Sequence, residues 1–151
     1  MKKITPLLWF DTQAEEAMNF YVSLFKNSKV LNVSHGPDGG AFTVSFELDG
    51  QEFIGLNAGP QFKFNEAISM FVNCEDQAEV DYFWNALITD GGEESMCGWL
   101  KDKYGLSWQI VPKQLGELMG DPDPEKSQRV MKAMLKMKKI IVADLQKAYG
   151  G

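Results

Sequence analysis

The chain has 151 residues, of which 44% are hydrophobic and 24% are charged. This composition argues against disordered and membrane-spanning classes, because no apolar run approaches the roughly 20 residues that a spanning helix needs. The net charge of −6 argues against a nucleic-acid surface, which requires clustered Lys and Arg. We expect a soluble, cytoplasmic protein, since no complete signal peptide is recognisable and the two cysteines form neither a disulfide nor a metal pattern.

Five elements are predicted over residues 1–60, in the order βαβββ. The helix is indicated by apolar residues at helical spacing, with Asp11 or Thr12 placed to cap its start. The last two strands flank Asp49-Gly50, a strong hairpin signal because both turn positions of a type I′ turn need positive φ. The predicted ranges are a strand over 4–10 buried on both faces, a helix over 13–25, and strands over 30–34, 41–48 and 52–57.

The same order repeats over residues 61–113. An offset of 63 residues superposes the apolar face of the first helix on that of the second, and it also aligns the first strands without a gap. Gly91-Gly92 is expected to end the second helix. The predicted ranges are a strand over 67–73, a helix over 77–88, a short segment around Met96, and a hairpin of strands over 98–101 and 107–111. We therefore predict an α+β fold in which two βαβββ modules form a single domain, 1–151.

Residues 114–151 form a predicted helical extension. Asp123 is placed to cap a helix that has Pro124 at its first position, and a last helix is predicted over 142–149. Met131, Met134 and Leu135 are expected to form the buried face of the extension between surface lysines. The residues expected to pack against the sheet or a partner subunit are Met131, Met134, Leu135, Met137 and Leu145.

Two signatures of this chain are Asp11 followed by Ala17-Met18-Asn19-Phe20-Tyr21, and the hairpin segment 102–110. They resemble the first strand–helix unit and the last hairpin of the vicinal-oxygen-chelate (glyoxalase/bleomycin-resistance) superfamily. The segments 62–68, 97–99, 108–112 and 129–134 are similar to its PhnB-like branch, whose proteins are often described as 3-demethylubiquinone-9 3-methyltransferase domains. The resemblance extends over essentially the whole chain.

The resemblance implies curved mixed sheets that each wrap around a cavity, and commonly a homodimer. In metal-dependent relatives the first and last strands of each module supply four ligands, and the matching places here are Ile4, Ile54, Ala67 and Gln109. Of these side chains only Gln109 can coordinate a cation, and the one histidine, His35, lies next to a glycine-rich loop. We therefore predict no metal site and no cofactor.

Side chains alternate across a strand, so the register predicts which residues face the cavity. With Ile54 and Gln109 facing inward, Phe53, Trp108 and Ile110 are expected to pack under the helices. The hairpin places Thr43 and Ser45 opposite Leu56 and Ile54. The predicted ligand-binding residues are Leu8, Thr43, Ser45, Ile54, Leu56, Ser69, Phe71, Ser107 and Gln109. Such a surface suits a small, partly apolar ligand.

Several residues have both a functional and a structural interpretation. Gln109 either orients a ligand or is satisfied by its neighbours, such as Ser69. Cys97 has no histidine nearby in sequence to activate its thiol. Glu66 is either a general base or a solvated strand end, and Trp99 either gates the cavity or closes a core or interface.

Three functions remain open. The preferred one is a metal-free binder of a small organic molecule; the others are an enzyme with unidentified acid–base residues and a dimeric structural or regulatory protein. A nucleotide-binding α/β methyltransferase would need alternating βαβ units and a glycine-rich first turn, whereas the glycines here lie at hairpins and helix ends. The expected partners are a small molecule and a second copy of the chain, with neither nucleic acid nor a membrane.

Overall fold

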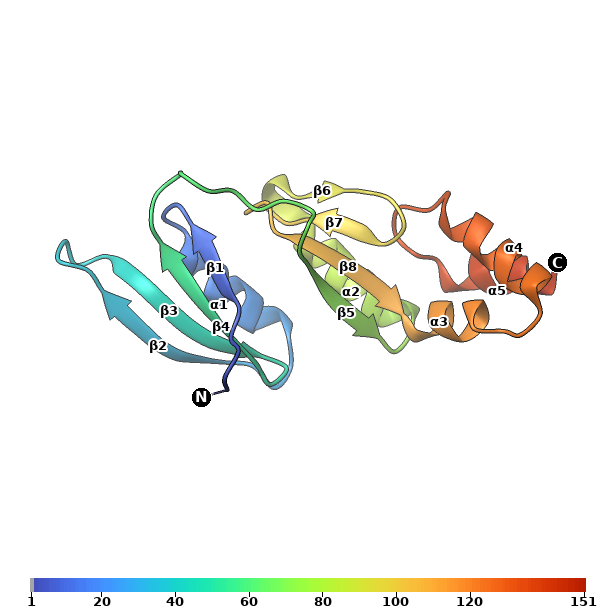
Figure 1. Cartoon of the computed structure of the whole chain (residues 1–151), viewed down its shortest axis with the longest axis horizontal. Helices are drawn as coiled ribbons and strands as arrows, with labels where there is room; N and C mark the ends of the chain where they lie inside the picture. The colour runs from blue at the N-terminus through green and yellow to red at the C-terminus, as the bar shows by residue number, and fades with distance from the viewer. Residues whose placement is uncertain (1) are drawn as a thin grey trace. The chain divides into compact units, whose positions relative to one another are not determined.

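The computed structural model describes residues 2–151 and contains the order βαβββ twice. The chain divides into two compact units, the first ending at Phe64 and the second being Asn65–Gly151. Each unit holds one four-stranded sheet, ordered β1-β4-β3-β2 in the first and β5-β8-β7-β6 in the second (Figure 1). In each sheet the first strand pairs in parallel with the last strand, β1 with β4 and β5 with β8, and the other pairs are antiparallel. The predicted α+β fold class is confirmed.

The elements of the first unit are β1 (Leu7–Phe10), α1 (Ala14–Leu24), β2 (Lys29–His35), β3 (Ala41–Leu48) and β4 (Gln51–Asn57). Those of the second are β5 (Ser69–Cys74), α2 (Gln77–Leu87), a 3₁₀ turn η1 (Thr89–Gly91), β6 (Glu93–Glu94), β7 (Trp99–Lys101) and β8 (Ser107–Pro112). The C-terminal helices are α3 (Lys113–Met119), α4 (Pro124–Met134) and α5 (Val142–Gly150). None of the helices within 2–151 is long and apolar enough to cross a membrane.

One face of the first sheet packs against α1. Tyr21 of the helix lies against Phe46, and Phe46 stacks on Phe53 with ring centroids 5.5 Å apart. All three side chains are buried, as expected for aromatic groups that supply much of a core. The prediction that Phe53 packs under the helix is confirmed, whereas β1 is shorter than predicted and is not buried on both faces, since Leu7 is 51% exposed.

The start of α1 is capped from outside the helix. Neither Asp11 nor Thr12 caps it; instead the side-chain carbonyl of Asn57, at the end of β4, accepts a hydrogen bond from the Ala14 amide at 2.8 Å. An amide oxygen can satisfy one of the first free N–H groups of a helix as well as a local cap does. The cap prediction is therefore wrong because the partner is distant in sequence.

The second sheet packs against α2 in the same way. Trp84 and Leu87 of α2, Leu100 of β7 and Trp108 and Ile110 of β8 are all buried. This confirms the predicted burial of Trp108 and Ile110 under the helix. The indole N–H of Trp84 donates to the Glu94 carboxylate at 2.9 Å, so the short edge strand β6 is tied to the helix.

Both predicted hairpins form. Asp49 and Gly50 have φ values of 49° and 81°, as a type I′ turn requires. In the second hairpin the buried carboxylate of Asp102 accepts hydrogen bonds from the Tyr104 and Leu106 amides and from the Trp108 indole. This turn is therefore held by one charged side chain with three donors.

The C-terminal helices pack around their own small core of Leu115, Val130, Ile140 and Leu145. Asp123 caps α4 and Pro124 begins it, as predicted, whereas α3 was not predicted. Met134 and Met137 pack against this core, but Met131 and Leu135 are 43% and 55% exposed, so their predicted burial is wrong. Val130 and Met134 occupy the inward stripe of the helix, and Met131 and Leu135 lie one residue further round it.

Candidate functional site

The face of the first sheet that α1 does not cover is called here the first open face. Register places Ile54 opposite Ser45 and Leu56 opposite Thr43, which confirms the predicted cross-strand pairs. These four side chains are partly buried, whereas Val44, Phe46 and Phe53, which alternate with them along the strands, are buried on the side of the helix. The first open face therefore carries two hydroxyls and two aliphatic groups.

Leu8 does not lie on this face. It pairs with Gly55 and is 6% exposed on the helix-covered side, whereas Leu7 pairs with Ile54 and Trp9 with Leu56. The prediction for Leu8 is therefore wrong, and the β1 side chains on the first open face are those of Leu7 and Trp9. Trp9 is fixed there by a hydrogen bond from its indole N–H to the Gly59 carbonyl at 2.9 Å and by an edge contact with Phe62.

The reason for this error is a difference of one residue between the units. Three residues separate β1 from α1, but only two separate β5 from α2. A gap-free offset that aligns the two helices thus places the two first strands one residue out of register. A slip of one residue moves every side chain of a strand to the opposite face.

The second open face, on the side of the second sheet away from α2, contains all four residues predicted for it. Ser69 pairs with Ser107, and Phe71 pairs with Gln109. On β7, the other neighbour of β8 in the sheet, Trp99 pairs with Gln109 and Lys101 pairs with Ser107. The Gln109 side-chain amide donates a hydrogen bond to Ser69 Oγ at 2.9 Å. A neighbouring side chain therefore satisfies the Gln109 amide, as one of its two interpretations expected, and the hydrogen bond orients the amide.

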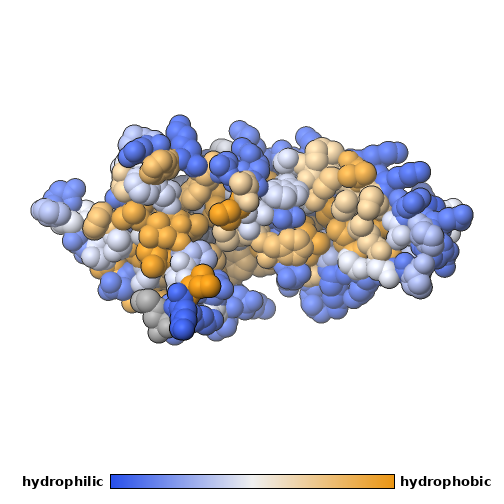
Figure 2. All heavy atoms as spheres, viewed as in Figure 1, coloured by the Kyte–Doolittle hydropathy of each residue, from blue (hydrophilic) through white to orange (hydrophobic). Residues whose placement is uncertain are grey.

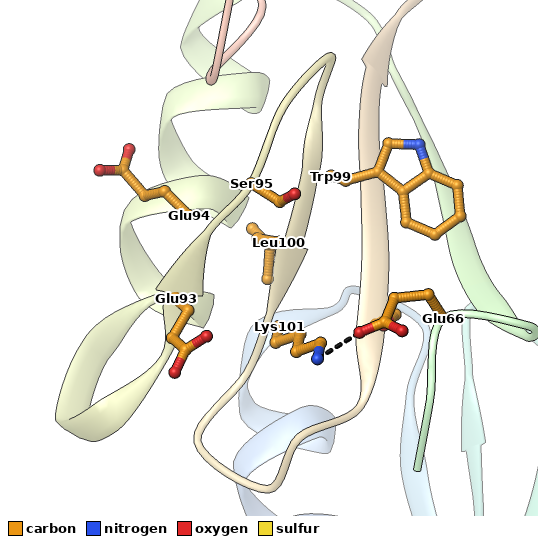
Figure 3. A pocket seen from close by; sticks show the side chains of 8 residues that line it. Glu66, Glu93, Glu94, Ser95, Trp99, Leu100 and Lys101 are labelled. Atoms are coloured by element: carbon orange, nitrogen blue, oxygen red, sulfur yellow. Dashed lines mark ion pairs between the residues drawn. The ribbon is translucent and has the colours of Figure 1, made fainter.

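A pocket of about 180 Å³ opens at this sheet beside β6 and β7 (Figure 3). The lining residues are Glu66, Glu93, Glu94, Ser95, Trp99, Leu100, Lys101 and Ser107. Ser107 is 1% exposed, and its hydroxyl has no hydrogen-bond partner among residues 2–151. A buried hydroxyl without a partner costs stability, so it is a polar group available to a ligand or a water molecule.

An ion pair lies at the pocket. The Lys101 ammonium contacts the Glu66 carboxylate, and Figure 3 shows the two side chains pointing toward one another. The hydrogen bond from Lys101 holds the pKa of Glu66 below its ordinary value, and the same bond raises the pKa of Lys101. Glu66 is therefore ionised at neutral pH, but its carboxylate is occupied by Lys101 and its lowered pKa makes it a weaker general base.

The cysteines give no sign of a nucleophile. Burial raises the pKa of the Cys74 thiol to about 12, with a smaller contribution from Glu79, so Cys74 stays protonated and unreactive. Cys97 lies in a turn with a φ of 60°, and its amide donates to the Met137 carbonyl at 2.7 Å. Its place in the fold is explained by this backbone contact with the C-terminal segment.

The residues at the four superfamily ligand places do not fit a metal ion. Ile54 and Ala67 offer hydrocarbon only, and Gln109 offers one neutral amide oxygen. Ile4 precedes β1 and is 85% exposed, so its predicted place on the sheet is wrong; Leu7, another hydrocarbon side chain, lies opposite Ile54 instead. Across residues 2–151 no group of three or more His, Cys, Asp or Glu side chains is arranged to hold a metal.

Sequence reasoning missed the charged part of the pocket. Lys101, Glu93 and Ser95 were not among the predicted site residues, although alternation along β7 from Trp99 places Lys101 on the same face. Glu93 was missed because β6 has only two residues and no periodic pattern.

Apolar side chains are also exposed on the second unit. Phe71 and Ile68 are 53% and 70% exposed, and Figure 2 shows hydrophobic residues at the surface among hydrophilic ones.

Comparison with known proteins places these observations in a family. The model of the 3-demethylubiquinone-9 3-methyltransferase family matches residues 2–111. PhnB protein from Bacillus cereus is 36% identical, with a TM-score of 0.68 over 74% of this chain and 99% of that chain. The resemblance to the PhnB-like branch is thereby confirmed.

Two further solved structures share the fold at lower identity. Protein PA1353 from Pseudomonas aeruginosa is 17% identical, with a TM-score of 0.61 over 74% of this chain and 98% of that chain. A gene product of Arabidopsis thaliana is 17% identical, with a TM-score of 0.51 over 72% of this chain and 96% of that chain. No curated protein matches this chain.

Proposed function

This chain belongs to the 3-demethylubiquinone-9 3-methyltransferase family, and from that premise we propose that it binds a small, partly apolar organic molecule without a metal ion. The proposed site is centred on the second open face, with Ser69, Phe71, Ser107 and Gln109 as contacts and Trp99 at its edge. The observation that carries the proposal is the buried Ser107 hydroxyl, which has no partner among the described residues and lines the pocket.

The chemistry of the face supports a partly apolar ligand. Phe71 is half exposed and Trp99 is partly buried, so both aromatic rings can cover an apolar body. The amide of Gln109 and the hydroxyls of Ser69 and Ser107 supply a few directional polar contacts. Small-molecule sites commonly combine an apolar lining with a few such polar groups. For the first unit by itself, Thr43, Ser45, Ile54 and Leu56 are proposed as ligand-binding residues of the first open face.

Methyl transfer on a nucleotide-type fold has less support. Each sheet contains a single parallel pair at one side, whereas nucleotide-binding α/β folds use a mostly parallel sheet and a glycine-rich first turn. An enzyme that uses acid–base residues on this face is the alternative. It is disfavoured because Glu66, the carboxylate considered as a general base, is occupied by the Lys101 ammonium, which also lowers its pKa and makes it a weaker proton acceptor.

The experiment is native mass spectrometry of the protein purified without added ligand. We expect an additional retained mass that is lost on denaturation and reduced in Gln109→Ala. Gln51→Ala is the matched control, because Gln51 lies in the first unit and its side-chain amide donates to the carbonyl of the neighbouring residue, Glu52. Absence of a retained mass, together with no binding in calorimetry against a library of small organic molecules, would overturn the proposal.

The homodimer remains a prediction, which sedimentation at micromolar concentration tests.

A further inference from the structure

The pocket beside β6 and β7 is lined by more negative than positive side chains. Its lining carries three carboxylates, Glu66, Glu93 and Glu94, and one ammonium, Lys101. Glu94 is held by the Trp84 indole and points toward α2, whereas Glu93 stands opposite Lys101 in the register of β6 and β7 (Figure 3). An anion entering here would therefore meet more negative than positive charge.

A second observation points to a ligand at the same place. The Ser107 hydroxyl is buried, lines the pocket and has no hydrogen-bond partner among residues 2–151. Ser107 is paired in register with Lys101, whose ammonium contacts Glu66. The Ser107 hydroxyl can exchange a hydrogen bond with an N–H or O–H group of a ligand, such as the hydroxyl of choline.

The pocket already contains one cationic group of the protein, the Lys101 ammonium. The Lys101 side chain is 38% exposed and Glu66 is 60% exposed, so their ion pair is solvent-screened and the lysine side chain has room to swing outward. Trp99 lines the same pocket, and the face of a tryptophan ring attracts cations. Carboxylates, a hydroxyl acceptor and an indole are the groups that recognise an organic ammonium.

We propose that this pocket binds a small organic cation, with the ammonium group of the ligand beside Glu66 and Glu93 in place of the Lys101 ammonium and its apolar body against Trp99. The inference rests on the proposed function, because it assigns a charge class to the ligand of the second open face. The volume of about 180 Å³ accommodates a compact molecule.

The test is a titration with three probes of nearly equal shape: choline, its neutral isostere 3,3-dimethylbutanol, and the anion 3,3-dimethylbutyrate. Calorimetry at low ionic strength should rank choline first and the anion last. Glu93→Gln should weaken choline about fivefold and leave the neutral probe unchanged, as expected for one lost charge contact. Glu117→Gln removes a carboxylate that does not line the pocket and should change neither affinity.

Lys101→Met is the complementary variant, because it leaves Glu66 without its cation and should tighten choline about fivefold. An unchanged urea midpoint of each variant establishes that the fold is intact. The inference is overturned if choline binds no better than the neutral probe, if none of the three binds, or if Lys101→Met weakens choline. A retained mass in native spectra alongside any of these results would leave the proposed function standing while the cation assignment fails.

Discussion

The Gln109 amide and the Ser69 hydroxyl, 40 residues apart in the sequence, share a hydrogen bond of 2.9 Å on the second open face. Because this bond fixes the amide before a ligand arrives, the two residues should act as a unit. We expect Gln109→Ala to weaken binding of 3,3-dimethylbutanol by about 1–3 kcal/mol.

Ser69→Ala should have a smaller effect on the same affinity, and the double variant should cost less than the sum of the two. Calorimetry on the four proteins measures this coupling. Strict additivity would mean that the hydrogen bond does not organise the site, and an unchanged affinity in Gln109→Ala would remove Gln109 from the site.

The open faces show what sequence periodicity can and cannot predict. The hairpin glycines fixed the register of β4 and β8 correctly, because a tight turn determines which residues lie opposite one another. No such turn precedes β1, so its register came from the offset between helices, and the three-residue connection to α1 then placed Leu8 on the wrong face. One extra residue in the loop before α1 thus made the predicted register of β1 wrong, although the two helices were aligned correctly.

Other features escaped prediction because they depend on contacts distant in sequence. Asn57 caps α1 across 43 residues, and nothing local marks it as a cap. Met131 and Leu135 fit a helical stripe as well as Val130 and Met134 do, and only the packing of α4 on Leu115 and Leu145 decides between them. The charged pocket likewise depends on Glu66 reaching Lys101 from outside the sheet.

Asp102 should be among the most sensitive polar positions for stability. Its buried carboxylate accepts from the Tyr104 and Leu106 amides and from the Trp108 indole, at 2.9, 3.1 and 2.8 Å. Asp102→Ala leaves these three donors without their acceptor, and we expect a loss of about 3 kcal/mol or more in the free energy of unfolding.

Urea denaturation measures this loss. Asp38→Ala is the control, because Asp38 accepts one exposed amide in another turn, from Gly40, and should cost less than about 1 kcal/mol. Equal effects of the two substitutions would contradict the role assigned to Asp102.

Gly98 should tolerate a side chain less well than Gly105. Both have positive φ, 84° and 86°, so alanine strains the backbone similarly at each position. A Cβ at Gly98 would lie 3.0 Å from the Ile110 carbonyl and 3.1 Å from Ile140, whereas at Gly105 it would meet nothing within 4 Å. We expect Gly98→Ala to be less stable than Gly105→Ala by about 1–3 kcal/mol. Thermal unfolding of the two variants decides this, and a reversed order would refute the close contact with Ile140.

Cys74 should make stability decrease at high pH. Burial raises the pKa of its thiol to about 12 in the folded state, against an ordinary value of 9.0. Between these values the folded protein holds a proton that the unfolded chain releases, so the free energy of unfolding falls as pH rises above 9. Cys74→Ala should reduce this decline between pH 9 and 10.5, and Cys97→Ala should leave it in place. Denaturation curves at several pH values give the slopes, and parallel slopes for wild type and Cys74→Ala would contradict the assignment.

Metal content is the measurement on which the metal-free part of the proposed function depends. Ile4, Ile54 and Ala67 cannot coordinate a cation, and Gln109 offers one neutral oxygen on an amide whose nitrogen is bonded to Ser69. Zinc, nickel, iron and manganese should therefore stay at background in untagged protein after gel filtration. Dialysis against EDTA should leave the affinity for 3,3-dimethylbutanol unchanged. A stoichiometric metal that survives gel filtration, or an affinity that falls with EDTA and returns with added metal, would show that ligands other than these four residues form a metal site.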